Sequence, residues 1–282
     1  MELISIHELE KASPLFRGRA GKAFALGLLR MLKVSEIERR IEGFEKYEGP
    51  EFARKINEEA GMTYTVNGLS REEAIGHFRA VLPEGPFITI SNHTMGALDG
   101  ISLIDFVGHI RPDYKYMVNA ILARFESLKD NIISVTPNGN MIATPTAQSI
   151  SGVRAAKEHL ASGGCLGLFP SGAVSDLKLF PSHGEPRVRD REWQMSIIKF
   201  IRNASVPVLP LRLLDGNSRF YYSLGLIDWR LRLLRLPSEL LNKSGKTLRI
   251  LAGPIISPAK LASFDSLDEL RAFLRTSVYS LK

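Results

Sequence analysis

Residues 85–110, GPFITISNHTMGALDGISLIDFVGHI, contain the local pattern that decides the expected fold. The run 87–91 is short, apolar and rich in β-branched residues, which is typical of a buried strand. A second apolar stretch, 97–110, is long enough to form a helix. A strand followed closely by a helix is the repeating unit of α/β proteins.

The same alternation continues along the chain. The pattern predicts strands at 114–119, 131–136, 165–169 and 206–213, and helices at 147–164, 192–204 and 266–278. Strands separated by helix-length segments favour a mostly parallel mixed sheet with helices on both faces. We therefore expect an α/β fold, with an N-terminal helical segment over residues 1–62 and the α/β domain over residues 63–282.

Composition narrows the possible classes of protein. The chain has 282 residues, of which 44% are hydrophobic and 24% charged, so it can bury a sizeable core. Its single cysteine, Cys165, excludes an internal disulfide and a cysteine-based zinc site. No signal peptide is recognisable, and no apolar run approaches the roughly 20 residues that cross a bilayer. We expect a cytoplasmic protein attached peripherally to the inner face of the cell membrane.

The net charge of +7 calls for an anionic partner. Two basic segments, 20–34 and 228–249, interleave Lys and Arg with leucines, and an amphipathic helix of this kind can lie in an anionic lipid interface. The alternative is that their apolar sides pack on the domain and their basic sides face solvent. Nucleic acid is not expected as a partner, because Tyr221, Tyr222 and Trp229 are too few and too embedded in leucine to form a stacking platform.

His93 and Asp99 follow the first strand of the pattern. In α/β sheets, ligand-binding groups gather on loops at the carboxyl ends of strands. Six residues apart, the two side chains meet only if the chain bends, and Gly96 permits that bend. A carboxylate on one imidazole nitrogen leaves the other nitrogen to accept a proton. The structural alternative is that His93 is a hydrogen-bonding residue at a strand end and Asp99 an acid in the first turn of a helix.

Other chemistries find little support. No H-E-x-x-H pattern or Cys/His cluster indicates a catalytic metal, so we expect neither a metal nor a cofactor. Ser171 lies in LFPSGAVS, where Phe169 and Ala173 occupy the glycine positions of the nucleophile elbow of serine hydrolases. A nucleophilic serine at this position is therefore a poor fit.

Three blocks in this order, GPFITISNHTMGALDG, LGLFPSGAVS and VPVLPLRL, resemble the glycerolipid (PlsC-type) acyltransferases. The stretch 215–255 resembles their hemolysin-like, ornithine/glycine-lipid subgroup, and the resemblance covers roughly residues 65 to 258. It implies a catalytic dyad at His93 and Asp99, because the subgroup shares the H-x5-D spacing seen here in place of the commoner H-x4-D.

The resemblance also implies a reaction. His93 would act as general base while a fatty acyl group moves from acyl-carrier protein or acyl-CoA to a hydroxyl of a lysolipid. The loops containing Gly96 and Ser171-Gly172 would offer backbone N–H groups to the developing oxyanion. The implied substrate-binding residues are Asn92, Gly96, Phe169, Pro170, Ser171, Gly172, Arg187 and Arg189.

One departure from the family pattern concerns the acceptor. The block that contains FPSGAVS here is usually F-P-E-G-T-R-S in members that make phospholipids, but Ser171 replaces the acid and Val174 the phosphate-contacting arginine. This favours an acylated amino acid over a phosphate-bearing lysophospholipid. Arg187, Arg189 and Arg191 are compatible either with anion contacts or with solvated surface charge. A non-catalytic lipid-binding protein and a lipid (thio)ester hydrolase remain alternatives, and the sequence leaves acyl-chain length, donor and oligomeric state open.

Overall fold

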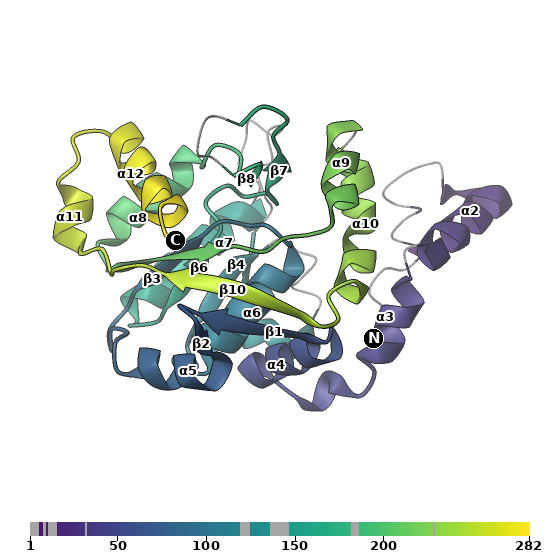
Figure 1. Cartoon of the computed structure of the whole chain (residues 1–282), viewed down its shortest axis with the longest axis horizontal. Coiled ribbons are helices and arrows are strands. Elements are labelled where there is room, and N and C mark those ends of the chain that lie inside the picture. Colours follow the sequence, from purple (N-terminus) through teal and green to yellow (C-terminus); the bar gives the residue numbers. More distant parts are fainter. Residues whose placement is uncertain are drawn as a thin grey trace.

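The computed structural model describes residues 6–7, 10, 16–31, 33–118, 125–135, 147–181, 186–227 and 229–282. One eight-stranded sheet, in the order β2-β1-β10-β9-β3-β6-β4-β5, forms its centre (Figure 1). The strands are β1 Met62–Val66, β2 Leu69–Ser70, β3 Ile88–Ser91, β4 Lys115–Val118, β5 Ile132–Ser134, β6 Leu166–Leu168, β9 Val208–Leu213 and β10 Lys246–Ala252. A separate two-stranded hairpin pairs β7 Asp176–Leu177 with β8 Val188–Arg189.

The expected mostly parallel mixed sheet is confirmed. β3 runs parallel to β6 and β9, β4 to β5 and β6, and β1 to β10, whereas β1 with β2 and β9 with β10 are antiparallel. Strands β1, β2 and β10 were not predicted. Residues 246–249 were expected to continue a basic amphipathic segment, but they begin β10, where buried Leu248 and Ile250 alternate with exposed Thr247 and Arg249. That period of two is typical of a strand.

Helices cover both faces of the sheet. α4 Gly49–Glu59, α5 Arg71–Arg79 and α6 Ala97–Gly108 share one apolar core with β1, β9 and β4. α7 Ala147–Ala161, α8 Met195–Ala204 and α12 Leu267–Tyr279 share the other with β3 and β6. The remaining helical segments are α2 Gly18–Met31, α3 Val34–Arg40, η2 Phe44–Lys46, η4 Glu126–Asn131, α9 Arg219–Ile227, α10 Trp229–Leu241 and α11 Pro258–Ala262.

Strand β3 occupies the middle of the sheet and is fixed on both faces. Ile88 and Ile90 are fully buried in the core under α7, α8 and α12. On the other face, the hydroxyls of Thr89 and Ser91 hydrogen-bond to those of Tyr114 and Tyr116, at 2.6 and 3.1 Å. The side chains alternate between two ordered environments, so the loop that follows β3 starts from a well-defined position.

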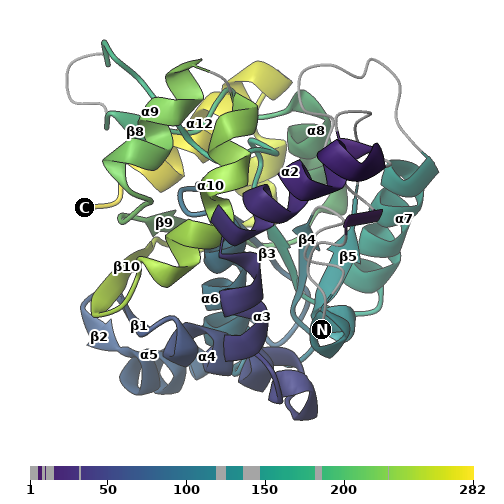
Figure 2. The ribbon, with the colours of Figure 1, turned by 90° about the vertical axis from the view of Figure 1, so that its right-hand side faces the viewer.

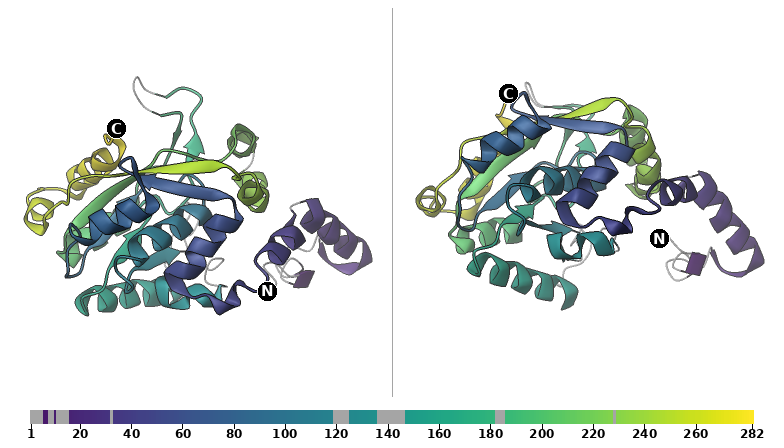
Figure 3. Two further views of the ribbon diagram at one scale, coloured as in Figure 1. Left: turned by 60° about the horizontal axis from the view of Figure 1, so that its bottom comes forward. Right: turned by 90° about the horizontal axis from the view of Figure 1, so that it is seen from below.

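The N-terminal helices lie to one side of the sheet. α2 and α3 project from the body of the molecule (Figure 3), and α3 contacts α10 (Figure 2). α4 packs on α6, and the expected boundary at 62/63 falls between the first two residues of β1. The division into two segments therefore stays a prediction. Among the described helices, none has the length and apolar character needed to cross a membrane.

Candidate active site

The chain bends sharply between β3 and α6. Gly96 adopts φ +81°, a left-handed conformation that favours glycine. The N–H groups of Met95 and Gly96 both donate to Asp99 Oδ2, at 2.7 and 3.1 Å. Asp99 is thus an acid in the first turn of α6 and satisfies backbone donors that the helix leaves free. Asp99 therefore has the structural role of a first-turn acid, and its carboxylate also has a side-chain partner.

That partner is His93, whose Nδ1 lies 2.9 Å from Asp99 Oδ2. Asp99 is completely buried, whereas 16% of the His93 side chain is exposed. An ionised carboxylate only accepts hydrogen bonds, so Nδ1 carries the hydrogen and Nε2 presents its lone pair. Among the described residues nothing hydrogen-bonds to Nε2. The arrangement leaves one nitrogen of a fixed imidazole ready to accept a proton.

Phe169, the first residue after β6, fixes the imidazole from its face. Its ring stacks on His93 with centroids 3.8 Å apart and planes 20° from parallel, and it also packs on Tyr116 at 4.6 Å. Such aromatic contacts contribute about 0.5–1.5 kcal/mol beyond the burial of area. The sequence predicted Phe169 as a substrate-binding residue, but its observed contact is with the imidazole itself.

The residues that follow Phe169 form a closed turn. Pro170 accepts a hydrogen bond from the Gln194 N–H at 2.9 Å, and Ser171 Oγ donates to the Ala173 carbonyl at 2.8 Å. Gly172 has φ +64°, a backbone conformation that favours glycine, and a Cβ there would also displace the amide of Gln194.

Two N–H groups of the loops expected to supply oxyanion donors are already engaged, and the expectation for the rest of these loops stays a prediction. The Gly172 N–H is bonded to the Phe169 carbonyl at 2.9 Å, and the Gly96 N–H to Asp99. Because both N–H groups already have acceptors within the protein, neither is free for a developing oxyanion.

Asp190 is a buried carboxylate that the sequence analysis missed. It accepts hydrogen bonds from the His93 N–H at 3.1 Å, Ser175 Oγ at 2.5 Å and Trp193 Nε1 at 3.1 Å. Burial raises its pKa, while these donors act in the opposite direction. The Ser175 N–H in turn donates to the His93 carbonyl at 2.6 Å. Ser175 and Asp190, which lie in a region without a periodic sequence pattern, therefore hold the carbonyl and the N–H of His93, respectively.

Asn92 connects β3 to β9. Its Nδ2 donates to the Leu213 carbonyl and its Oδ1 accepts from the Leu213 N–H, both at 2.8 Å. The residue was predicted to bind substrate, yet these polar atoms are engaged by the neighbouring strand. Its observed contribution is to hold the base of the His93 loop against the end of β9.

The three arginines that follow the Ser171 loop in sequence have different surroundings. Arg187 is exposed on the β7–β8 hairpin, Arg189 is partly buried in β8 opposite Asp176, and Arg191 pairs with Asp176 at 2.6 Å. Arg232, on α10, is only 4% exposed and was not predicted. It donates to the carbonyls of Val174 and Ser175, at 3.2 and 2.8 Å, and to Asp176 at 2.8 Å. A cation from a distant helix thus holds the loop in which Val174 replaces the family's arginine.

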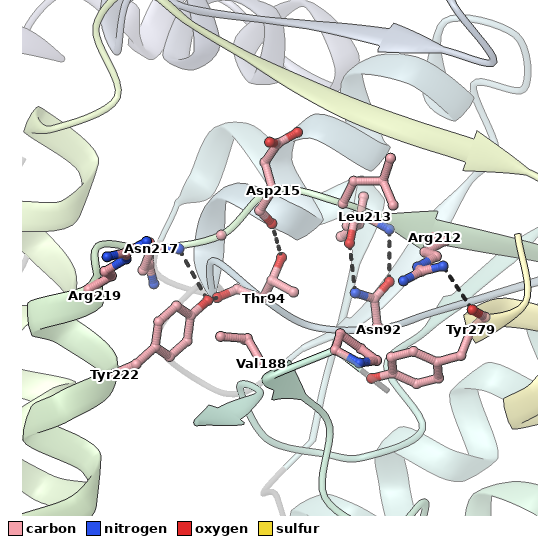
Figure 4. Close-up of a pocket in the computed structure, with 13 residues that line it drawn as sticks. Asn92, Thr94, Val188, Arg212, Leu213, Asp215, Asn217, Arg219, Tyr222 and Tyr279 are labelled. Carbon is pink, nitrogen blue, oxygen red and sulfur yellow. Dashed lines mark hydrogen bonds between the residues drawn. The ribbon is translucent and has the colours of Figure 1, made fainter. Parts of the chain in front are cut away.

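A cavity of about 230 Å³ opens beside these loops (Figure 4). Asn92 and Thr94, the neighbours of His93 in sequence, line it together with residues of β8, of the segment after β9 and of α12. His93 and Asp99 are not among its lining residues. Among the described residues, no group of three or more His, Cys, Asp or Glu side chains is placed to hold a metal ion.

Comparison with known proteins identifies the family to which the chain belongs. A family model described as acyltransferase matches residues 8–282, so the chain belongs to the acyltransferase family. The lyso-glycine lipid O-acyltransferase of Phocaeicola vulgatus is 26% identical over 211 residues, covering 71% of this chain and 70% of the relative. Its counterpart in Bacteroides thetaiotaomicron is 24% identical over 189 residues, covering 64% of each chain.

A solved structure is also similar. The 1-acyl-sn-glycerophosphate acyltransferase PlsC from Thermotoga maritima aligns with a TM-score of 0.48 and 14% identity, over 91% of this chain and 86% of that one. The family match and the two curated relatives confirm the expected enzyme class, an O-acyltransferase.

Proposed function

We propose that this acyltransferase moves a fatty acyl group from a thioester donor to a hydroxyl of a lysolipid, with His93 as general base and Asp99 as its orienting carboxylate. The observation that carries the proposal is the 2.9 Å contact between His93 Nδ1 and Asp99, together with an Nε2 that has no partner among the described residues. The same contact supports the proposal that His93 and Asp99 are the histidine and aspartate of the H-x5-D motif of the hemolysin-like subgroup.

In the proposed reaction, His93 takes up one proton and later returns it. The acceptor hydroxyl gives its proton to His93 Nε2 as its oxygen attacks the thioester carbonyl, and Asp99 stabilises the imidazolium that forms. The tetrahedral intermediate then expels the thiolate, which takes the proton from Nε2. General base catalysis supplies about 10²–10⁴-fold, so orientation of the two substrates must supply much of the remainder.

Two observations favour an acylated amino acid as acceptor. The curated relatives are lyso-glycine lipid O-acyltransferases. In addition, Ser171 and Val174 stand where the family pattern for phospholipid synthesis has an acid and a phosphate-contacting arginine. The donor is acyl-carrier protein or acyl-CoA, and lipid synthesis at a membrane is the process that such a reaction serves.

Exposed apolar side chains support attachment to the inner, anionic face of the cell membrane. Leu179 and Phe180 beside β7 are 61% and 95% exposed, and Phe220 and Ile227 at the two ends of α9 are 58% and 76% exposed. α9 contacts β7, and both lie at the upper edge of Figure 1. Lys178 and Arg219 adjoin these apolar residues, so the surface combines apolar and basic side chains as interfacial attachment requires.

Flotation with liposomes tests this surface. We expect the wild type to float with vesicles that contain anionic lipid, and salt to weaken the attachment. Phe180→Ser and Phe220→Ser should reduce flotation. Ile150→Ser is the matched control, since Ile150 is 61% exposed on α7, a helix that lies on the opposite side from α9 in Figure 2. Equal flotation of all three variants would refute the assignment of the surface.

Product analysis tests the reaction. Purified protein is incubated with acyl-carrier protein or CoA thioesters and a panel of acceptors, namely a hydroxyacyl glycine, a hydroxyacyl ornithine and lysophosphatidic acid. Mass spectrometry should find a new ester on the acylated amino acids. Free fatty acid formed equally with and without acceptor would instead identify a (thio)ester hydrolase, and binding of lipid with neither product would identify a lipid-binding protein.

A further inference from the structure

Arg212 lies at the edge of the cavity described above and has no counter-ion among the described residues. It lies on β9, partly buried, with its Nη1 donating to the carbonyls of Tyr279 and Leu281 at 2.8 and 2.5 Å. Its guanidinium carbon is 5.9 Å from the centroid of the Tyr279 ring. Among the described residues no carboxylate pairs with it, and its Nε and Nη2 have no hydrogen-bond partner. Burial lowers the pKa of this guanidinium.

The other charged groups of the cavity do not neutralise Arg212. Asp215 lines the cavity, but Arg249 holds both of its carboxylate oxygens, at 2.9 and 3.1 Å. Arg219 lies at the opposite side of the cavity in Figure 4 and has no ion pair in the described part of the chain. The cavity therefore presents net positive charge to a ligand.

The cavity approaches the proposed base around the end of the sheet. β3 and β9 are parallel with Ser91 opposite Leu211, so the Cα atoms of His93 and Arg212 are roughly 6 Å apart if the register continues. Because side chains alternate along a strand, the imidazole and the guanidinium point to different faces. Thr94 lies between the two sites, lining the cavity while its hydroxyl approaches Asp99 Oδ1 at 3.4 Å.

We propose that this cavity is an anion subsite in which Arg212 binds the carboxylate of the acylated amino acid, with Arg219 at the rim. The inference rests on the proposed function and names what selects the acceptor. A guanidinium binds a carboxylate through two parallel N–H donors, and a neutral headgroup would leave the half-buried cation unpaired. Headgroup selection is thus made by β9 rather than by the loop containing Val174.

Binding of an unreactive acceptor tests the subsite without turnover. The probe is an N-acyl glycine that lacks the hydroxyl, compared with its methyl ester by calorimetry on the full chain. We expect the wild type to bind the acid about 10- to 100-fold more tightly than the ester, the range of one charge-assisted contact. Arg212→Gln should abolish this preference, and Arg212→Lys should retain part of it. His93→Ala should retain all of it, because His93 does not contact the headgroup.

A second variant leaves Arg212 in place. Arg249 is 60% exposed, and Arg249→Gln releases the charge of Asp215 into the cavity, so it should weaken binding of the acid but not of the ester. In transfer assays, Arg212→Gln should raise KM for the acid acceptor with little change in kcat.

Three results overturn the subsite. The first is equal affinity of the wild type for the acid and the ester. The second is a preference for the acid that survives in Arg212→Gln. The third is displacement of the bound N-acyl glycine by phosphopantetheine from the wild type but not from Arg212→Gln. The last result would assign Arg212 to the phosphate of the donor. Failure of the proposed function is distinct, since it would appear as absence of transfer to every hydroxyl while the binding preference stood.

Discussion

Replacing Asp99 by asparagine separates the two contributions that a carboxylate makes to its histidine. All three strong donors, the His93 Nδ1–H and the N–H groups of Met95 and Gly96, converge on the single oxygen Oδ2. An asparagine whose amide oxygen takes that place keeps all three hydrogen bonds, and its NH₂ group then faces the Thr94 hydroxyl. The ring orientation and the protonated nitrogen should therefore be unchanged, and only the negative charge is lost.

The size of the effect follows from the distance. Two unit charges about 4 Å apart interact by about 4 kcal/mol at the effective dielectric constant typical near a protein surface. The imidazolium formed during transfer loses this support, so kcat should fall by roughly 10²–10³-fold, at 1.36 kcal/mol for each factor of ten. Asp99→Ala removes orientation as well as charge and should cost more than Asp99→Asn.

The assay measures kcat by mass spectrometry of the esterified product at saturating donor and acceptor. Asp105→Asn is the matched control, because Asp105 is equally buried on the same helix but bonds to Asn57 and pairs with Arg54, away from His93. That variant should lose stability yet keep the kcat of its folded fraction. If Asp99→Asn turns over within about threefold of wild type, the charge of Asp99 has no part in catalysis.

Three further substitutions test the supports of the site. Phe169→Ala removes the ring stacked on the imidazole and should lower kcat about 2- to 10-fold, whereas Phe169→Tyr should keep the kcat of the wild type. Comparable kcat values for the two variants would contradict a role for the stacking. Gly96→Ala forces a left-handed φ and brings Cβ within 3.0 Å of Leu236, so urea denaturation should show a loss of about 1–3 kcal/mol, and an unchanged midpoint would contradict the strain. Arg232→Met leaves the Val174 and Ser175 carbonyls without their donor while Asp176 keeps Arg191, so it should cost about 1–3 kcal/mol, with faster hydrogen exchange at 174–176. Unchanged exchange there would show that Arg232 does not hold the loop.

Much of the fold could be predicted because periodicity and burial agree. The run 87–91 and the helix after Gly96 are both strongly apolar, and the observed β3 and α6 match them within one or two residues. β1 and β10 were missed for a physical reason. Both are short and alternate polar with buried apolar residues, and over five and seven residues that period of two is not distinct from the pattern of an amphipathic surface segment. Their pairing is set by contact with each other, which no local window contains.

The candidate site divides in the same way. His93, Asp99 and Gly96 lie within seven residues of sequence, so their spacing carried the prediction, and the structure brings the first two together. Asp190 and Arg232 reach the same loops from 97 and 58 positions away along the chain. Each looks like an ordinary surface charge until the fold buries it. Arg212 gave no signal either, because what distinguishes it is that no carboxylate in the described part of the chain pairs with it.

The most direct test of the central claim is the transfer rate of His93→Ala. We expect His93→Ala to fold, with the circular dichroism and lipid binding of the wild type. Its kcat for ester formation should be lower by at least about 10²-fold. Ester formation by folded His93→Ala at a rate close to that of wild type would contradict the assignment of His93 as the base.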